Sequence, residues 1–198
     1  MVREDKVVTC GIAEEQIKLE ILEDPVALGK VFQEVQPSRV LVTTGVNFPR
    51  GTDDFEYWMY RHWHTNCYLP LHVLMTWFEQ EGDGYPPKGA HFVAVSSNSA
   101  HIPRSQSMAY NSSKAALSMA LRSAARDVGK AGLDMAVYGY EPGLVRGTPM
   151  SAKRGGTRML GLPEGIGRRT LASHIVNGLL WGGTEMNGTM HRIDAGEV

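Results

Sequence analysis

Cysteine is scarce in this sequence, which has only Cys10 and Cys67 in 198 residues. Two cysteines cannot build the disulfide framework that stabilises small secreted proteins, so a reducing, cytoplasmic setting is the simpler expectation. The seven histidines also lack the spacing of a metal site. His62 and His64 lie two apart, and no cysteine or carboxylate pattern completes a set of ligands. We therefore expect no bound metal.

Long hydrophobic runs and an excess of one charge are also missing. No apolar run approaches the roughly 20 residues that span a bilayer, and the polar, charged N-terminus is unlike a signal peptide. The formal net charge of −1 gives no electrostatic reason to expect nucleic acid or membrane as a partner. With 42% hydrophobic and 21% charged residues, the composition is that of a globular protein, and we expect one domain over residues 1–198.

What the chain does contain is a regular alternation of strand-like and helix-like segments. Residues 89–97 and 133–140 read as buried strands because they are apolar runs of strand length, and residues 115–128 between them have helical composition. The alternation predicts an α/β fold with a Rossmann-like parallel sheet and helices on both faces. Ligands of such sheets bind beyond the carboxyl ends of the strands, where Thr43, Ser97 and Pro142 would converge.

Tyr110 and Lys114 form a Tyr-x-x-x-Lys pattern at the start of the predicted helix. Positions four apart are neighbours on a helix, so the two side chains share one face. An ammonium held near a phenol favours the phenolate form. A tyrosine placed in this way can exchange a proton with an alcohol or carbonyl near neutral pH. The pattern is short, and its surroundings decide its meaning.

Those surroundings are a strand that ends in serines before the helix and a strand that ends in a Pro-Gly turn after it. This arrangement resembles the short-chain dehydrogenase/reductase family. In that family the catalytic serine lies thirteen residues before the tyrosine, a spacing that selects Ser97. The family's Pro-Gly turn packs by the nicotinamide and corresponds to Pro142 and Gly143. A family threonine corresponds to Thr148, at a spacing about one residue longer than usual.

The resemblance extends in both directions. Residues 38–47 are similar to the family strand that ends in Asn-Asn-Ala-Gly, with threonines in place of the asparagines, one residue fewer, and Gly45 as the glycine. Residues 64–70 are similar to the segment that carries the family's helix asparagine, which is Asn66 here. Residues 187–196 are similar to the closing strand of the family. The similarity therefore covers nearly the whole chain.

The front end of the family pattern is missing. Family members begin with a strand, a Gly-x-x-x-Gly-x-Gly loop that approaches the dinucleotide pyrophosphate, and a helix. Here Lys6 to Ile17 resemble the family's third strand and the helix that follows it, with Gly11 where an aspartate would touch the adenine. Alternatively, Lys6 to Cys10 are a displaced first strand. Under both alignments the fold is N-terminally truncated relative to the family, and an edge of its sheet is exposed unless the opening strand or another subunit covers it.

Residues 161–167 match Gly-x-x-x-Gly-Ile-Gly letter for letter. In a circularly permuted protein they would form the phosphate loop, with Asp194 as the ribose-binding acid. That motif needs a buried strand directly before it, whereas residues 151–160 are polar, basic and rich in glycine. The alternative is a substrate-side loop that leads into the last helix, which Pro163 would begin.

The resemblance implies an oxidoreductase that transfers a hydride between NAD or NADP and a small-molecule alcohol or carbonyl substrate. It also implies a homodimer or homotetramer. The alternative hypothesis is a non-catalytic binding or scaffold protein that keeps the fold and has lost dinucleotide binding. The residues that the resemblance selects are Ser97, Tyr110, Lys114 and Asn66 for catalysis, and Tyr110, Lys114, Pro142, Gly143, Thr148 and Gly45 for the cofactor.

Overall fold

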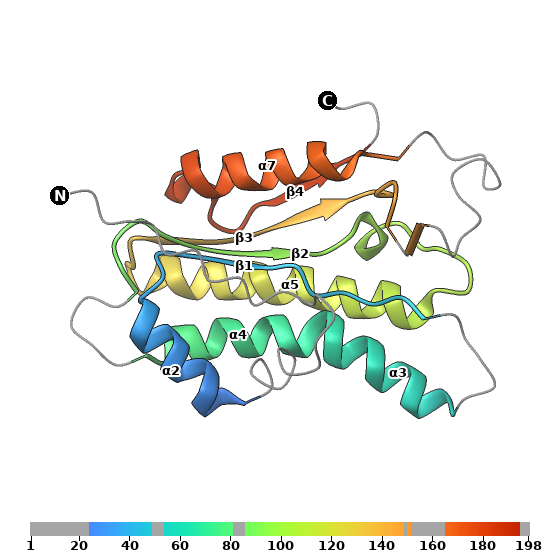
Figure 1. Ribbon diagram of the computed structural model, residues 1–198, viewed down its shortest axis with the longest axis horizontal. Coiled ribbons are helices and arrows are strands. Elements are labelled where there is room, and N and C mark those ends of the chain that lie inside the picture. Colours follow the sequence, from blue (N-terminus) through green and yellow to red (C-terminus); the bar gives the residue numbers. More distant parts are fainter. Residues whose placement is uncertain (1–23, 49–53, 81–85, 149, 152–164, 195–198) are drawn as a thin grey trace.

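The computed structural model describes residues 24–48, 54–80, 86–148, 150–151 and 165–194. Within these ranges four parallel strands form one sheet in the order β1-β2-β3-β4 (Figure 1). The strands are β1 (Arg39–Val42), β2 (Ala90–Val95), β3 (Met135–Pro142) and β4 (Met190–Ile193). Because all four strands point the same way, their carboxyl ends meet at one edge of the sheet. The prediction of an α/β, Rossmann-like parallel sheet is confirmed.

The central strands are buried on both faces, as the continuous apolar runs predicted. All eight residues of β3 and the first five of β2 are buried. Strand β1 alternates instead between exposed and buried positions, with Val40 and Val42 inward and Leu41 38% exposed. On its outer side β1 has no partner strand within the described residues. Strand β4 is the other edge of the described sheet, and only one of its four residues is buried.

Three helices build the larger core on one face of the sheet (Figure 1). These are α2 (Pro25–Val35), α4 (Leu69–Phe78) and α5 (Met108–Lys130), and α3 (Phe55–Trp63) continues the layer beside α5. Asp24 caps α2 by accepting hydrogen bonds from the Val26 and Ala27 amides, and Pro25 occupies its first turn. Buried side chains of the core include Phe32, Leu69, Trp77, Phe92, Leu117 and Leu121.

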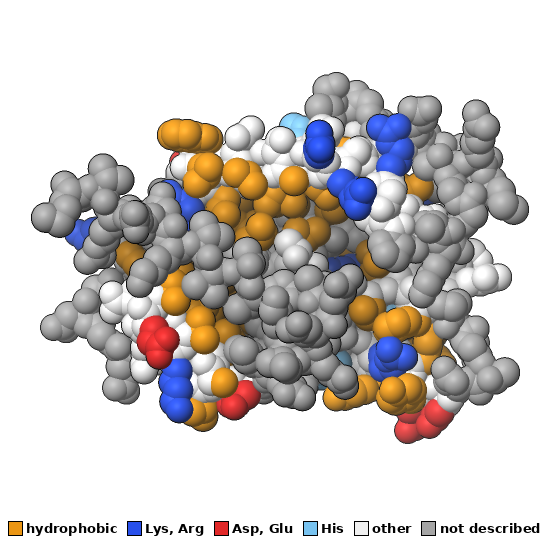
Figure 2. All heavy atoms as spheres, in the orientation of Figure 1, with side chains coloured by type: hydrophobic (Ala, Val, Ile, Leu, Met, Phe, Trp, Pro, Cys, Tyr) orange, Lys and Arg blue, Asp and Glu red, His pale blue; other side chains and the backbone are white. Residues whose placement is uncertain are grey.

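The opposite face of the sheet packs against α7 (Arg168–Trp181). Its smaller core joins Val93, Tyr138 and Ile193 of the sheet to Ile175 of the helix. Hydrophobic side chains gather between α7 and the sheet on the face shown in Figure 2. A short 3-10 turn, Thr184–Met186, connects α7 to β4. Helices therefore lie on both faces, as expected.

Two element boundaries differ from those read in the sequence. Strand β3 continues through Pro142, because Glu141 and Pro142 stay in register with Arg192 and Ile193 of β4. The last helix begins at Arg168 and not at Pro163, since Gly167 is still extended. The predicted strand at residues 6–10 and all but the first residue of the polar, basic segment 151–160 lie outside the described residues. In the part of the chain that the structure describes, no helix has the length and apolarity needed to cross a membrane.

Candidate active site

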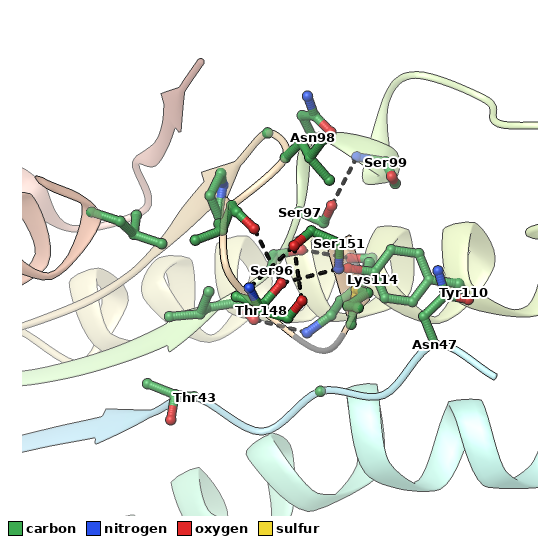
Figure 3. Close-up of a pocket in the computed structure, with 18 of the residues that line it drawn as sticks. Thr43, Asn47, Ser96, Ser97, Asn98, Ser99, Tyr110, Lys114, Thr148 and Ser151 are labelled. Atoms are coloured by element: carbon green, nitrogen blue, oxygen red, sulfur yellow. Dashed lines mark hydrogen bonds between the residues drawn. The ribbon is translucent and has the colours of Figure 1, made fainter. Parts of the chain in front are cut away.

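A cavity of about 730 Å³ lies at the carboxyl ends of the strands (Figure 3). Segments that follow β1, β2 and β3 line it, together with the first turns of α5 and of α7. This is the position that the parallel topology predicted. Seven of the selected residues line the cavity: Gly45, Ser97, Tyr110, Lys114, Pro142, Gly143 and Thr148.

Tyr110 and Lys114 lie one turn apart at the start of α5, and both are buried, with 6% and 2% of their surfaces exposed. The Lys114 ammonium donates to the Val95 carbonyl oxygen at 2.8 Å and to that of Thr44 at 3.3 Å. Burial lowers the pKa of Lys114 to about 8, and the nearby Cys67 acts in the opposite direction. Near neutral pH the site therefore holds a buried, charged ammonium in the same cavity as the phenol.

Ser97 follows β2 and caps the 3-10 turn η2 (Asn98–Ala100). Its hydroxyl oxygen accepts the Ser99 amide proton at 3.2 Å, which leaves the hydroxyl proton free for a ligand oxygen. Figure 3 shows Ser97, Tyr110 and Lys114 around the same space. The neighbouring Ser96 contacts the protein instead, because its hydroxyl donates to the Lys114 carbonyl oxygen at 3.1 Å.

Asn66 is fully buried and does not line the cavity. It lies in a π-helix, His64–Tyr68, between α3 and α4. Its side chain accepts from the Val46 amide at 2.7 Å and donates to the Val46 carbonyl oxygen at 2.9 Å and to Ser113 Oγ at 3.0 Å. Asn66 thus fixes the backbone after β1 against α5. Local widenings of this kind are frequent at functional sites.

The glycines of the site let neighbouring side chains lie close to the backbone. A Cβ atom at Gly45 would lie 3.3 Å from Lys114 Nζ and 3.8 Å from Asn66 Oδ1, so this position brings the backbone close to the lysine. A Cβ atom at Gly143 would collide with the Asp194 carboxylate. Asp194 accepts a hydrogen bond from Asn98 Nδ2 at 2.9 Å. Gly143 therefore lets the turn after β3 pack against the end of β4.

Thr148 closes a small turn at the far side of the cavity. Its hydroxyl donates to the Val145 carbonyl oxygen at 3.1 Å and accepts from the Ser151 amide at 3.2 Å. The Thr148 amide in turn donates to Ser151 Oγ at 3.1 Å. The extra residue of spacing noted in the sequence still brings Thr148 to the cavity wall.

Residues 165–167, the described end of the glycine-rich match, lie beside the turn after β3. The Ile166 amide donates to the Leu144 carbonyl oxygen at 2.8 Å, and the Ile166 carbonyl accepts from the Arg146 amide at 2.9 Å. Gly167 then precedes the first residue of α7. This arrangement agrees with a substrate-side loop that leads into the last helix, while residues 161–164 lie outside the described ranges.

Several contacts in the site could not be found from the sequence. The acceptors of the lysine are the backbone carbonyls of Thr44 and Val95, and main-chain acceptors have no side-chain signature. Ser113 was part of the quoted Tyr-x-x-x-Lys run, yet its bond to Asn66 spans 47 positions of the chain. Only the folded arrangement brings these groups together.

Comparison with known proteins supports the fold and the family resemblance. A family model described as short chain dehydrogenase matches residues 78–158. The resemblance to the short-chain dehydrogenase/reductase family is confirmed. The matched residues contain β2, the serine turn (Ser97 with η2, Asn98–Ala100), α5 and β3, which carry Ser97, Tyr110 and Lys114. Among curated proteins, no sequence matches the chain.

Solved structures of this family share the fold. A short chain dehydrogenase from Burkholderia cenocepacia in complex with NADP matches with a TM-score of 0.67 and 20% identity, covering 87% of this chain and 72% of that one. A 7 alpha-hydroxysteroid dehydrogenase complexed with NADH and 7-oxo glycochenodeoxycholic acid gives 0.70 and 18%, covering 89% and 72%. Aldohexose dehydrogenase from Thermoplasma acidophilum gives 0.70 and 16%, covering 87% and 74%.

Proposed function

We propose that this chain is an oxidoreductase that transfers a hydride between NAD or NADP and a small alcohol or carbonyl substrate. The observation that carries the proposal is the buried Lys114 ammonium, fixed by two carbonyl oxygens in the cavity that Tyr110 and Ser97 also line. Burying a charge is costly, and a site that only needed packing could use an apolar side chain. A lysine retained at this cost supports a chemical role.

The described residues fit the nicotinamide end of such a cofactor. The NADP and NADH of the solved relatives belong to those proteins, and for this chain we propose the same class of ligand. Tyr110, Lys114 and Gly45 would hold the nicotinamide ribose side, and Pro142, Gly143 and Thr148 the nicotinamide ring side. Within the described residues, the buried Thr44 hydroxyl has no hydrogen-bond partner. Thr44 lines the cavity, so its hydroxyl is available to bind a polar group of a ligand.

The pyrophosphate end is different. Within the ranges that the structure describes, no Gly-x-x-x-Gly-x-Gly turn follows a strand. Such a turn is what lets the backbone approach a pyrophosphate at a helix N-terminus. The nicotinamide end of the site is therefore the part whose residues we assign.

The proposed chemistry uses the residues of the chain as follows. Ser97 donates its hydroxyl proton to the substrate oxygen and orients it. Tyr110 passes a proton to that oxygen during reduction and takes it back during oxidation, as a general acid and base. Lys114 stabilises the phenolate that remains, because an opposite charge nearby favours the charged form. The cofactor, when bound, supplies or accepts the hydride. Asn66 acts indirectly by holding the backbone at Val46.

The cavity wall supports an apolar substrate. Leu144, Val145, Met150 and Leu171 line the side nearest the turn after β3 and α7. The polar lining includes Ser97, Tyr110 and Lys114, and also Asn98, Arg104 and Arg168. Pockets of this composition bind apolar molecules and orient them through a few polar contacts. We infer that the substrate is a small, mainly apolar alcohol or ketone.

The test is binding of NADH and NADPH to the purified chain by titration calorimetry, followed by oxidation of the reduced cofactor with a panel of small ketones. The variant is Tyr110→Phe, and the matched control is Tyr60→Phe, because Tyr60 is exposed on α3. We expect Tyr60→Phe to behave as wild type. Tyr110→Phe should bind cofactor and lose about 10²-fold or more of its turnover. No binding at millimolar cofactor would reject the enzyme and favour the scaffold hypothesis.

We also propose that the chain self-associates through α3, α4 and α5. Exposed aromatic and sulfur side chains lie along these helices: Tyr60 on α3, Tyr68 in the π-helix between α3 and α4, Met75 on α4 and Met119 on α5. Hydrophobic side chains over α3 are visible in Figure 2. Exposed apolar patches commonly mark interfaces. Sedimentation of the wild type and of a Tyr68→Glu variant should show a dimer or tetramer that the variant weakens, and a monomeric wild type would contradict the proposal.

A further inference from the structure

Glu141 is a carboxylate with no exposed surface, next to the Pro-Gly turn of the site. It is the last residue of β3 before Pro142, and it does not line the cavity. A buried carboxylate is stable only when it is paired and hydrogen-bonded. The mechanism above does not use this residue, so its burial needs another explanation.

Three groups face the Glu141 carboxylate, each from a different element. His101 Nε2 lies 2.9 Å from Oε1 and 2.8 Å from Oε2. The Ser118 hydroxyl of α5 donates to Oε1 at 2.7 Å. Arg192 Nε of β4 lies 3.8 Å from Oε2 and is more than half exposed, so its contribution is screened by solvent. The short contacts are therefore those to His101 and Ser118.

His101 connects this carboxylate to the serine turn. It follows η2 directly, and its amide donates to the Asn98 carbonyl oxygen at 3.1 Å. Ser97 precedes the same turn, and its carbonyl accepts from the Ala100 amide at 3.0 Å. The pair of His101 and Glu141 therefore fastens the far end of the turn to the end of β3, and Ser97 caps the near end.

Ser118 connects the carboxylate to the lysine. Its hydroxyl lies 2.8 Å from that of Ser96, and Ser96 donates to the Lys114 carbonyl oxygen at 3.1 Å. Each hydroxyl has one proton, so with Ser118 donating to Glu141 the Ser96 proton is donated either to Ser118 or to the Lys114 carbonyl oxygen. All of these groups are buried, so each depends on its polar neighbours, and the contacts join the end of β3 to α5.

We propose that Glu141 and His101 are positioning residues that hold the serine turn and the start of α5 at a fixed separation. The consequence for Ser97 and Lys114 as reacting groups rests on the proposed function. The structural part of the proposal is independent of that function, because the restraint on the turn can be measured without turnover. A short hydrogen bond to a charged group is stronger than one between neutral groups. Its removal should therefore loosen the turn measurably.

The first test is amide hydrogen exchange of residues 97–102 in the chain without cofactor. His101→Leu removes the ring nitrogens, His101→Gln keeps an N–H donor, and His174→Leu is the matched control because His174 is exposed on α7. We expect exchange about tenfold faster in His101→Leu, close to wild type in His101→Gln, and unchanged in His174→Leu. Unchanged exchange in His101→Leu, or equal acceleration in both His101 variants, would overturn the proposal.

A double-mutant cycle with Glu141→Gln gives a second, independent measurement. If the two residues act as a pair, His101→Leu in the Glu141→Gln background should add little to the exchange rate. Additive effects would show that the pair is not coupled and would also overturn the proposal.

Turnover gives the functional measurement. In an active wild type, His101→Leu should lower kcat about tenfold and leave the dissociation constant of NADPH within about twofold. Restoration of kcat by His101→Gln would distinguish positioning from a general loss of structure. Unchanged kcat in His101→Leu would refute the functional role. A wild type that neither binds cofactor nor turns over would reject the proposed function alone, because the exchange measurements still decide whether the turn is fastened.

Discussion

The buried Lys114 gives a stability prediction that needs neither cofactor nor substrate. Replacement by methionine keeps the length of the side chain and removes its charge. Burial lowers the pKa of Lys114 to about 8 from an ordinary value of 10.5. This difference corresponds to about 3 kcal/mol that the folded protein spends at neutral pH to keep the ammonium buried. Methionine avoids that cost and loses the bonds to the Val95 and Thr44 carbonyls.

The sign of the pH dependence follows from proton linkage. Between pH 8 and pH 10.5 the unfolded chain binds a proton at this lysine that the folded chain has released. The free energy of unfolding therefore rises with pH across this window. This gain in the free energy of unfolding is fully present above pH 10.5 and is lost as the pH falls through 8. In Lys114→Met it is absent at every pH.

The assay is urea unfolding of both proteins, followed by circular dichroism at several pH values. At neutral pH we expect Lys114→Met to be at least as stable as the wild type. The difference, wild type minus variant, should increase by about 3 kcal/mol as the pH rises through the window. Burial raises the pKa values of Tyr138 and Tyr140, but these groups are present in both proteins, so their effect on the difference cancels.

Cys67 needs its own control. Burial raises the pKa of its thiol, and the Lys114 charge acts against that rise, so removal of the lysine also changes the cysteine. The comparison is therefore repeated in a Cys67→Ser background, where we expect the same slope. A difference that stays flat with pH, or falls as the pH rises, would refute a lowered lysine pKa and with it the argument that the lysine is kept for chemistry.

Other replacements test the packing around the site. Asn66→Leu should cost about 3 kcal/mol in urea unfolding, because it leaves the buried backbone groups of Val46 without partners; a loss below 1 kcal/mol would contradict the bracing role. Gly178→Ala would gain helix propensity at an ordinary position, but here the new methyl group meets the Tyr140 hydroxyl, so we expect a lower melting temperature and a loss of about 1–3 kcal/mol. Leu121→Ala should lose about 2–5 kcal/mol, whereas Leu180→Ala, at an exposed position of α7, should stay within about 0.5 kcal/mol in the same assay; similar losses in both would contradict the assigned core.

The sequence predicted those parts of the molecule whose signal is local. The apolar runs of β2 and β3 and the small-residue helix that carries Tyr110 are found close to their predicted positions. The convergence of Thr43, Ser97 and Pro142 on one cavity also follows from parallel strands, whose carboxyl ends share an edge.

Long-range pairing was beyond the sequence. The extension of β3 to Pro142 depends on register with β4, and a proline usually ends a strand in sequence reading. The link from Glu141 to His101 joins residues 40 positions apart, and neither belongs to a motif. The π-helix around Asn66 left no signal, because an extra residue in a turn changes hydrogen bonding and not composition.

The π-helix at His64–Tyr68 has a geometric consequence for the chain on either side. One α-helical residue turns the direction of the side chains by about 100°, so removing a single residue from this segment would rotate α3 relative to α4 by about that angle. The indole of Trp58 and the ring of His62, both buried now, would then point elsewhere, or Asn66 would turn away from Ser113. The buried faces of α3 and α4 cannot both be kept with a regular α-helix between them. The π-helix therefore sets the rotation of α3 relative to α4, and it places the Asn66 amide in contact with both the backbone after β1 and α5.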